Sequence, residues 1–84
     1  MRKQITIVGV GDRRQGTSAK TQKVYDFTPV SFTYEMPWTK GLKAATCNVS
    51  QDCMPGYTPS IGDTVEAVMR EDYRTGQVYI DAIL

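Results

Sequence analysis

The chain has 84 residues, no histidine and a net charge of +1, a length that makes one domain and buries only about 60–65% of its unfolded surface. Without histidine the usual general base near neutral pH is missing, and no Gly-rich phosphate loop is present, so the composition argues against an enzyme and against a bound cofactor. The small net charge conceals an asymmetry, because residues 1–43 hold eight of the ten basic side chains and residues 44–84 hold six of the nine acidic ones. This asymmetry predicts that one surface of the protein binds a polyanion.

Short runs of β-branched and aromatic residues, bounded by Gly, Pro, Asn and Asp, recur along the whole chain. No segment shows a sustained apolar period of 3.6 residues, so the chain is predicted to be all-β. Residues 4–10 alternate in polarity, with Ile5 and Ile7 on one face, and this pattern predicts the first strand. Gly11 and Asp12 are expected to end it.

A basic segment follows this strand. It holds four cations and no acid within residues 13–23: Arg13, Arg14, Lys20 and Lys23. The segment leads into two rings in alternation, Tyr25 and Phe27. Cations neutralise phosphates and release counterions, and exposed rings offer faces on which unpaired bases stack. The pattern predicts a protruding basic wing, residues 14–23, that contacts single-stranded nucleic acid; a solvated loop and core packing of the rings are the alternatives.

The second strand is predicted from about residue 20 to residue 34, bent or interrupted at Pro29, which has no N–H for a ladder. In a regular strand Phe32 and Tyr34 share the face opposite to the first two rings and belong to the core. A bulge at Pro29 would bring all four rings to one surface. Tyr34 remains a candidate contact with nucleic acid because its hydroxyl group suits a solvent-exposed surface.

A turn is predicted over residues 36–41 and a third strand over residues 42–49. Trp38 in the turn is a candidate for stacking on a base, with burial under the turn as the alternative, and Lys43 is a candidate phosphate contact. Two cysteines, Cys47 and Cys53, cannot complete a tetrahedral zinc site, so no metal is expected. Since no signal peptide precedes them, free thiols in a cytoplasm are favoured over a disulfide.

The remaining chain predicts two further strands, residues 64–69 and 77–84, after an irregular stretch. The hairpin between them carries Tyr73 and Arg74, which either close over nucleic acid or merely form a turn. Five short strands ending in a hairpin favour a small five-stranded barrel of the OB type with a protruding β wing, in one domain of residues 1–84. No apolar run approaches the roughly 20 residues that cross a bilayer, so no membrane partner is expected.

Residues 14–20 (RQGTSAK), followed by Tyr25 and Phe27, resemble the DNA-binding wing of the single-stranded DNA-binding proteins of filamentous bacteriophages, the gene V protein type. Residues 57–59 and 80–83 resemble the closing strands of that family more loosely. The chain departs from the family near its end, where Ala82 and Leu84 stand in place of arginines.

The resemblance implies an OB-like barrel that forms a homodimer and coats phage single-stranded DNA cooperatively during replication, in the host cytoplasm. It implies phosphate contacts at Lys20 and Lys23 and ring contacts at Tyr25 and Phe27. An RNA-binding translational regulator and a protein-interaction module of a mobile element are the alternatives. Competition between DNA and RNA of matched sequence separates the first alternative, because a site that uses the 2′-hydroxyl prefers RNA.

Overall fold

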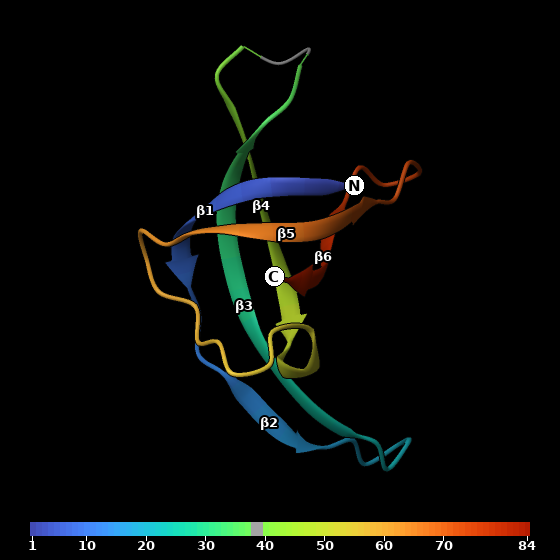
Figure 1. Ribbon diagram of the computed structural model, residues 1–84. Helices are drawn as coiled ribbons and strands as arrows, with labels where there is room; N and C mark the ends of the chain where they lie inside the picture. Colours follow the sequence, from blue (N-terminus) through green and yellow to red (C-terminus); the bar gives the residue numbers. More distant parts are fainter. Residues whose placement is uncertain (38–39) are drawn as a thin grey trace.

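A computed structural model describes residues 1–37 and 40–84 and consists mainly of antiparallel strands (Figure 1). The elements are β1 (Arg2–Val10), β2 (Arg14–Thr17), β3 (Val24–Glu35), β4 (Leu42–Ser50), a 3-10 turn η1 (Gln51–Cys53), β5 (Thr64–Glu71) and β6 (Val78–Ile83). The described residues form no α-helix, which confirms the all-β prediction, and they therefore contain no helix of membrane-spanning length and hydropathy.

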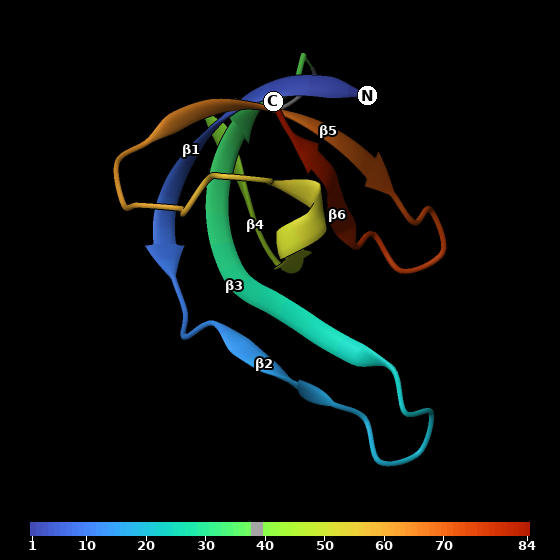
Figure 2. The ribbon, with the colours of Figure 1, turned by 60° about the horizontal axis from the view of Figure 1, so that its bottom comes forward.

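The long strand β3 organises the sheet. β4 pairs along one of its edges, and β1 and β2 pair one after the other along the opposite edge. β1 also pairs with β5, and β5 pairs with β6, so that the order is β2-β3-β1-β5-β6 with β4 on the other side of β3. Figure 2 shows β3 curving from the β2 end of the molecule to the far end of the sheet.

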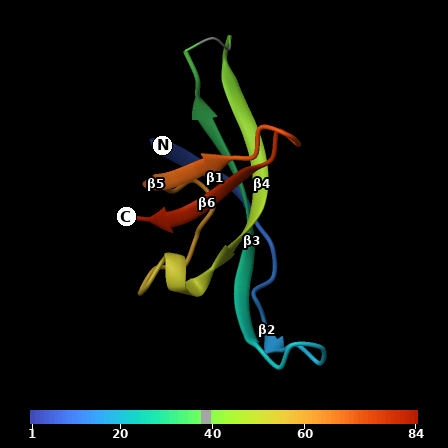
Figure 3. The same cartoon turned by 90° about the vertical axis from the view of Figure 1, so that its right-hand side faces the viewer.

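The sheet has six strands and is not closed into a barrel over the described residues, unlike the five-stranded barrel expected from the sequence. β4 and β6 lie side by side, and Gln77 Nε2 donates across the gap to the carbonyl of Thr46 at 3.1 Å, but no backbone ladder joins them (Figure 3). The additional strand is β2. Its four residues, RQGT, carry no apolar alternation, so the sequence predicted a wing at this place but not a separate strand.

The core lies on one face of β3. Thr28, Val30, Phe32 and Tyr34 are buried, while the residues between them are partly exposed. Phe32 is fully buried, and its ring centroid lies 5.9 Å from that of Tyr34. The remaining buried apolar side chains are Ile5, Ile7, Cys47, Val49, Met54, Ala67, Met69, Val78, Ile80 and Ile83. The regular-strand interpretation of Phe32 and Tyr34 as core residues is therefore correct.

β3 passes through Pro29 without a break, because its register with β4 is continuous from Phe27 to Glu35. The carbonyl of Pro29 accepts a hydrogen bond from the N–H of Gly11 at 2.8 Å. Since the N and O of one strand residue face the same edge, the missing N–H of Pro29 faces the gap between β1 and β2, where no ladder bond requires it. The interruption predicted at Pro29 is therefore wrong for β3, and the break in the sheet lies between β1 and β2, on the edge that Pro29 faces.

The connection from η1 to β5 is fastened by Tyr57. Its hydroxyl donates to the carboxylate of Asp63 at 2.6 Å, and Gln51 Nε2 donates to the carbonyls of Met54 and Tyr57, each at 3.2 Å. Burial and the hydrogen bond to Asp63 raise the pKa of Tyr57 to about 12.

We expect Tyr57→Phe to lower the free energy of unfolding by about 1 kcal/mol through loss of this hydrogen bond. Because the pKa is raised above its ordinary value of 10.0, the neutral phenol stabilises the fold fully below pH 10.0, and the stabilisation is lost as the pH rises towards 12. Denaturant unfolding and a phenolate absorbance titration measure both effects. Tyr73→Phe, at a side chain 92% exposed, is the control; an identical alkaline titration for the two variants contradicts the assignment.

Candidate nucleic-acid interface

β2 and the beginning of β3 form a two-stranded hairpin that extends beyond the rest of the sheet (Figure 2). The ladder to β4 starts only at Phe27, so residues 24–26 have β2 as their one strand partner. The N–H of Ser18 donates to the carbonyl of Lys23 at 2.9 Å and closes the loop of residues 18–23. This β2–β3 hairpin, residues 14–27, contains the predicted wing.

One face of the β2–β3 hairpin carries the two predicted rings. Arg14 pairs with Phe27, and Gly16 pairs with Tyr25, so all four residues share a face. The ring centroids of Tyr25 and Phe27 are 5.9 Å apart, with their planes tilted by 39°. A Cβ atom on Gly16 would lie 2.6 Å from the Tyr25 hydroxyl oxygen, so glycine is required for the ring to lie across β2. Tyr25 remains 42% exposed.

The opposite face is braced by an ion pair. Arg13 donates to both carboxylate oxygens of Asp26, with Nε to Oδ1 at 2.8 Å and Nη2 to Oδ2 at 2.6 Å. Gln15 Nε2 also donates to Oδ2, at 3.3 Å. The hydrogen bonds lower the pKa of Asp26 and raise that of Arg13. Arg13 therefore has a carboxylate partner within the protein, and its predicted contact with nucleic acid stays a prediction.

We expect Asp26→Asn to loosen the β2–β3 hairpin while leaving the core unchanged, because this pair joins the segment before β2 to β3. Since the pKa of Asp26 is lowered, the pair acts fully above the ordinary value of 3.8 and is lost as the pH falls below it. The protection of the amides of residues 15–17 and 24–26, measured as the ratio of intrinsic to observed exchange rate at the same pH, should fall severalfold in the variant and, for the unmodified protein, in acid. Asp12→Asn, at an adjacent exposed acid, should leave exchange unchanged; equal exchange in both variants contradicts the bracing role.

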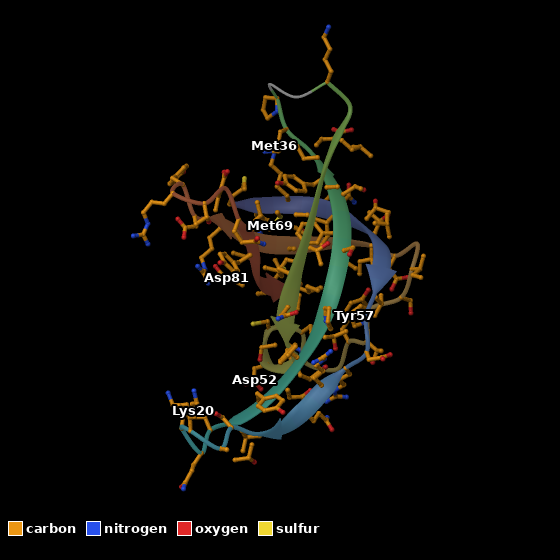
Figure 4. The ribbon with its side chains drawn as sticks, turned by 180° about the vertical axis from the view of Figure 1, so that it is seen from behind. Lys20, Met36, Asp52, Tyr57, Met69 and Asp81 are labelled. Carbon is orange, nitrogen blue, oxygen red and sulfur yellow. The ribbon has the colours of Figure 1, made fainter. Side chains whose placement is uncertain are left out.

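Three predicted cations on the β2–β3 hairpin carry unengaged charge. Arg14, Lys20 and Lys23 are exposed, and none of the four ion pairs found among the described residues involves them. Lys20 lies at the tip of the hairpin (Figure 4). The hairpin thus combines positive charge with an exposed ring, the two components of a binding surface for single strands.

A second group of predicted residues lies at the other end of β3. Lys43 pairs with Tyr34 near the start of β4, and Lys43, Met36 and Tyr73 line a groove of about 580 Å³. Tyr73 is 92% exposed, while Arg74 lies 3.7 Å from the carboxylate of Asp72. A strand of this length places its two ends about 35 Å apart. Within one copy, the structure therefore does not bring this group to the β2–β3 hairpin.

Two further predicted contacts lie elsewhere. Tyr34 is 3% exposed and faces the core, where burial raises the pKa of its phenol. It lies on the face of β3 opposite to Tyr25, so the surface proposed below does not include it. Trp38 lies outside the described residues.

Two residues that the sequence did not single out, Ser50 and Asp52, lie beside the rings. They line a notch of about 490 Å³ together with the first four residues of β3: Val24, Tyr25, Asp26 and Phe27. The notch depends on the register of β4 on β3, which pairs Ser50 with Phe27. No local pattern in the sequence could reveal that pairing.

Comparisons with protein-family models, with curated proteins and with solved structures found no match. Within residues 1–37 and 40–84 no group of three or more His, Cys, Asp or Glu side chains could hold a metal ion. Cys47 and Cys53 are free thiols, and burial raises the pKa of the Cys47 thiol.

Proposed function

We propose that this chain is a non-enzymatic single-stranded DNA-binding protein whose β2–β3 hairpin holds the strand. The observation that carries the proposal is the exposed Tyr25 ring lying across Gly16, on a hairpin with three unengaged cations. Unpaired bases can reach such a ring, whereas the bases of a duplex are stacked on one another and cannot. The resemblance of residues 14–27 to the wing of gene V-type phage proteins supports the same function.

In this arrangement the phosphates lie along Arg14, Lys20 and Lys23, and the bases stack against Tyr25. Stacking on a ring does not distinguish one base from another strongly, so binding extends over many sequences. Such a mode suits a protein that coats phage single-stranded DNA during replication.

The fold proposed for this function is a partly open barrel of the OB type. The strand order β4-β3-β1-β5-β6 and the contact between the outer strands β4 and β6 support it. OB-type domains are partly open five-stranded barrels that bind oligonucleotides. In this proposal the β2–β3 hairpin is the wing attached to that barrel.

We also propose that the protein acts as a homodimer. A chain of this size gains stability from a partner subunit. Apolar side chains that remain exposed support this proposal: Leu42 at 59%, Ile61 at 71% and Leu84 at 61%. Light scattering of the free protein gives the mass, and a monomer would contradict the dimer without affecting the binding surface.

Titration with oligo(dT) at two salt concentrations tests the function. We expect tyrosine fluorescence to be quenched as bases stack, and the logarithm of the affinity to fall with the logarithm of the salt concentration by about 0.7 for each phosphate neutralised. Equal affinity for duplex DNA, or tight binding that does not change with salt, would contradict the proposal. Stronger binding to RNA of matched sequence would favour the RNA-binding alternative.

A further inference from the structure

The notch beside the rings has two chemically different walls. β4 ends at Ser50, opposite Phe27, and the chain then turns away in η1. The notch of about 490 Å³ is lined by the first four residues of β3, the two rings among them, and by Ser50 and Asp52 from the end of β4 and from η1. Figure 4 shows Asp52 at the same end of the molecule as the hairpin that carries Lys20. A notch of this volume has room for a single nucleobase, since pockets of about 300–1,000 Å³ hold larger, drug-sized ligands.

The two carboxylates of the notch are not equivalent. Asp26 is engaged by Arg13 on the opposite face of the β2–β3 hairpin. Asp52 is exposed, and no hydrogen bond or ion pair of its carboxylate is found within the described part of the chain. The Asp52 carboxylate, which as an ion only accepts hydrogen bonds, is therefore the group available to a ligand.

An unpaired base stacked on Tyr25 keeps its Watson–Crick edge free of the ring, so that edge is open to hydrogen bonds with side chains beside the stack. Cytosine, adenine and guanine each carry an exocyclic amino group there, and carboxylates accept hydrogen bonds from the amino group of cytosine. Thymine and uracil present a carbonyl oxygen at the position of the cytosine amino group. A carboxylate attracts the amino group and repels the carbonyl oxygen.

We infer that the notch holds one unpaired base and that Asp52 gives this position a preference for bases with an exocyclic amino group. This inference rests on the proposed single-stranded DNA binding and adds base selection to it. Elsewhere on the hairpin, contact is through phosphates and ring faces, which carry little sequence information.

The Asp52 carboxylate has two effects on binding, repulsion of phosphates and a hydrogen bond to amino groups, and an experiment can separate them. A carboxylate near the path of the phosphates repels every oligonucleotide alike, so the repulsion changes all affinities by the same factor and cancels in their ratio. Its hydrogen bond to an amino group, by contrast, affects only the bases that carry one. The ratio of the affinities for two oligonucleotides therefore measures base selection by Asp52, whereas a change common to both affinities measures the effect of its charge.

The test compares oligo(dC) with oligo(dU) of equal length, at slightly alkaline pH and equal salt, by anisotropy of a labelled strand. Cytosine and uracil both lack the thymine methyl group. They differ in that cytosine has an amino group where uracil has a carbonyl oxygen, and at the adjacent ring nitrogen. We expect the unmodified protein to bind oligo(dC) about fivefold more tightly or better. In Asp52→Ala the affinity for oligo(dU) should rise, because the repulsion by the carboxylate is removed, and the ratio of the two affinities should fall to about one.

Glu35→Ala is the matched control, because it removes an exposed acid at the opposite end of β3, and it should keep the ratio. Asp52→Asn, which preserves the side-chain shape, replaces the alanine variant if that variant is unstable, and its ratio should fall below that of the unmodified protein. A ratio near one in the unmodified protein, or one that persists without the Asp52 carboxylate, overturns the inference and leaves single-strand binding in place. Absence of binding to both oligonucleotides overturns the proposed function and the inference with it.

Discussion

Replacement of both Lys20 and Lys23 by alanine is expected to weaken binding of single-stranded oligo(dT) by about 25-fold at ~0.1 M salt. Each cation that neutralises a phosphate on a single strand releases about 0.7 counterion, which contributes about 1 kcal/mol at that salt concentration. The slope of log affinity against log salt should therefore become shallower by about 1.4. Anisotropy of a labelled oligo(dT) at several salt concentrations gives the affinity and the slope together.

The control is a double variant with the same change of net charge, Lys3→Ala with Lys40→Ala. Both of these lysines lie outside the β2–β3 hairpin. If the hairpin is the binding surface, the control loses much less affinity and keeps its salt slope. An equal loss in the two double variants would mean that net charge, rather than the hairpin, determines binding.

The same two lysines illustrate what the sequence could predict. Their spacing from Tyr25 and the absence of an acid within residues 13–23 identified a basic wing, and the structure has a protruding hairpin there. Alternation placed Ile5 and Ile7 on one face of the first strand, and the structure confirms this, because both side chains are buried in the core. These features are local, because they depend on the two-residue period of a strand and on charge along the chain.

Features that depend on pairing between strands could not be predicted from local patterns in the sequence. The face occupied by Tyr34 depended on whether Pro29 carries a bulge, and only the continuous register with β4 decides this. The partner of Arg13 is another such case. Asp26 lies thirteen residues away and reaches it only because β2 folds back on β3. Whether the sheet closes into a barrel likewise depends on the approach of β4 to β6, and these strands lie side by side without a backbone ladder.

A comparison of two tyrosines separates binding from stability. Tyr25 is 42% exposed, so Tyr25→Ala should change the free energy of unfolding little and weaken binding by about 1–3 kcal/mol, the worth of one base stacked on a ring. Tyr34 is 3% exposed and lies in the core, so Tyr34→Ala should lower the free energy of unfolding by about 3–5 kcal/mol. That loss is a large fraction of the roughly 5–15 kcal/mol that stabilises a typical domain.

Denaturant unfolding followed by circular dichroism measures the stability of each variant, and anisotropy of labelled oligo(dT) measures its affinity. The conservative variant Tyr34→Phe keeps the buried ring and should retain most of the stability and all of the binding. Binding lost in Tyr34→Phe at full stability would show that the phenol of Tyr34 contacts the strand, which would require the core face of β3 to open. Unchanged binding in Tyr25→Ala would instead show that the ring of Tyr25 is not part of the interface and that the hairpin contacts phosphates alone. The quenching by oligo(dT) would then have to arise at another ring.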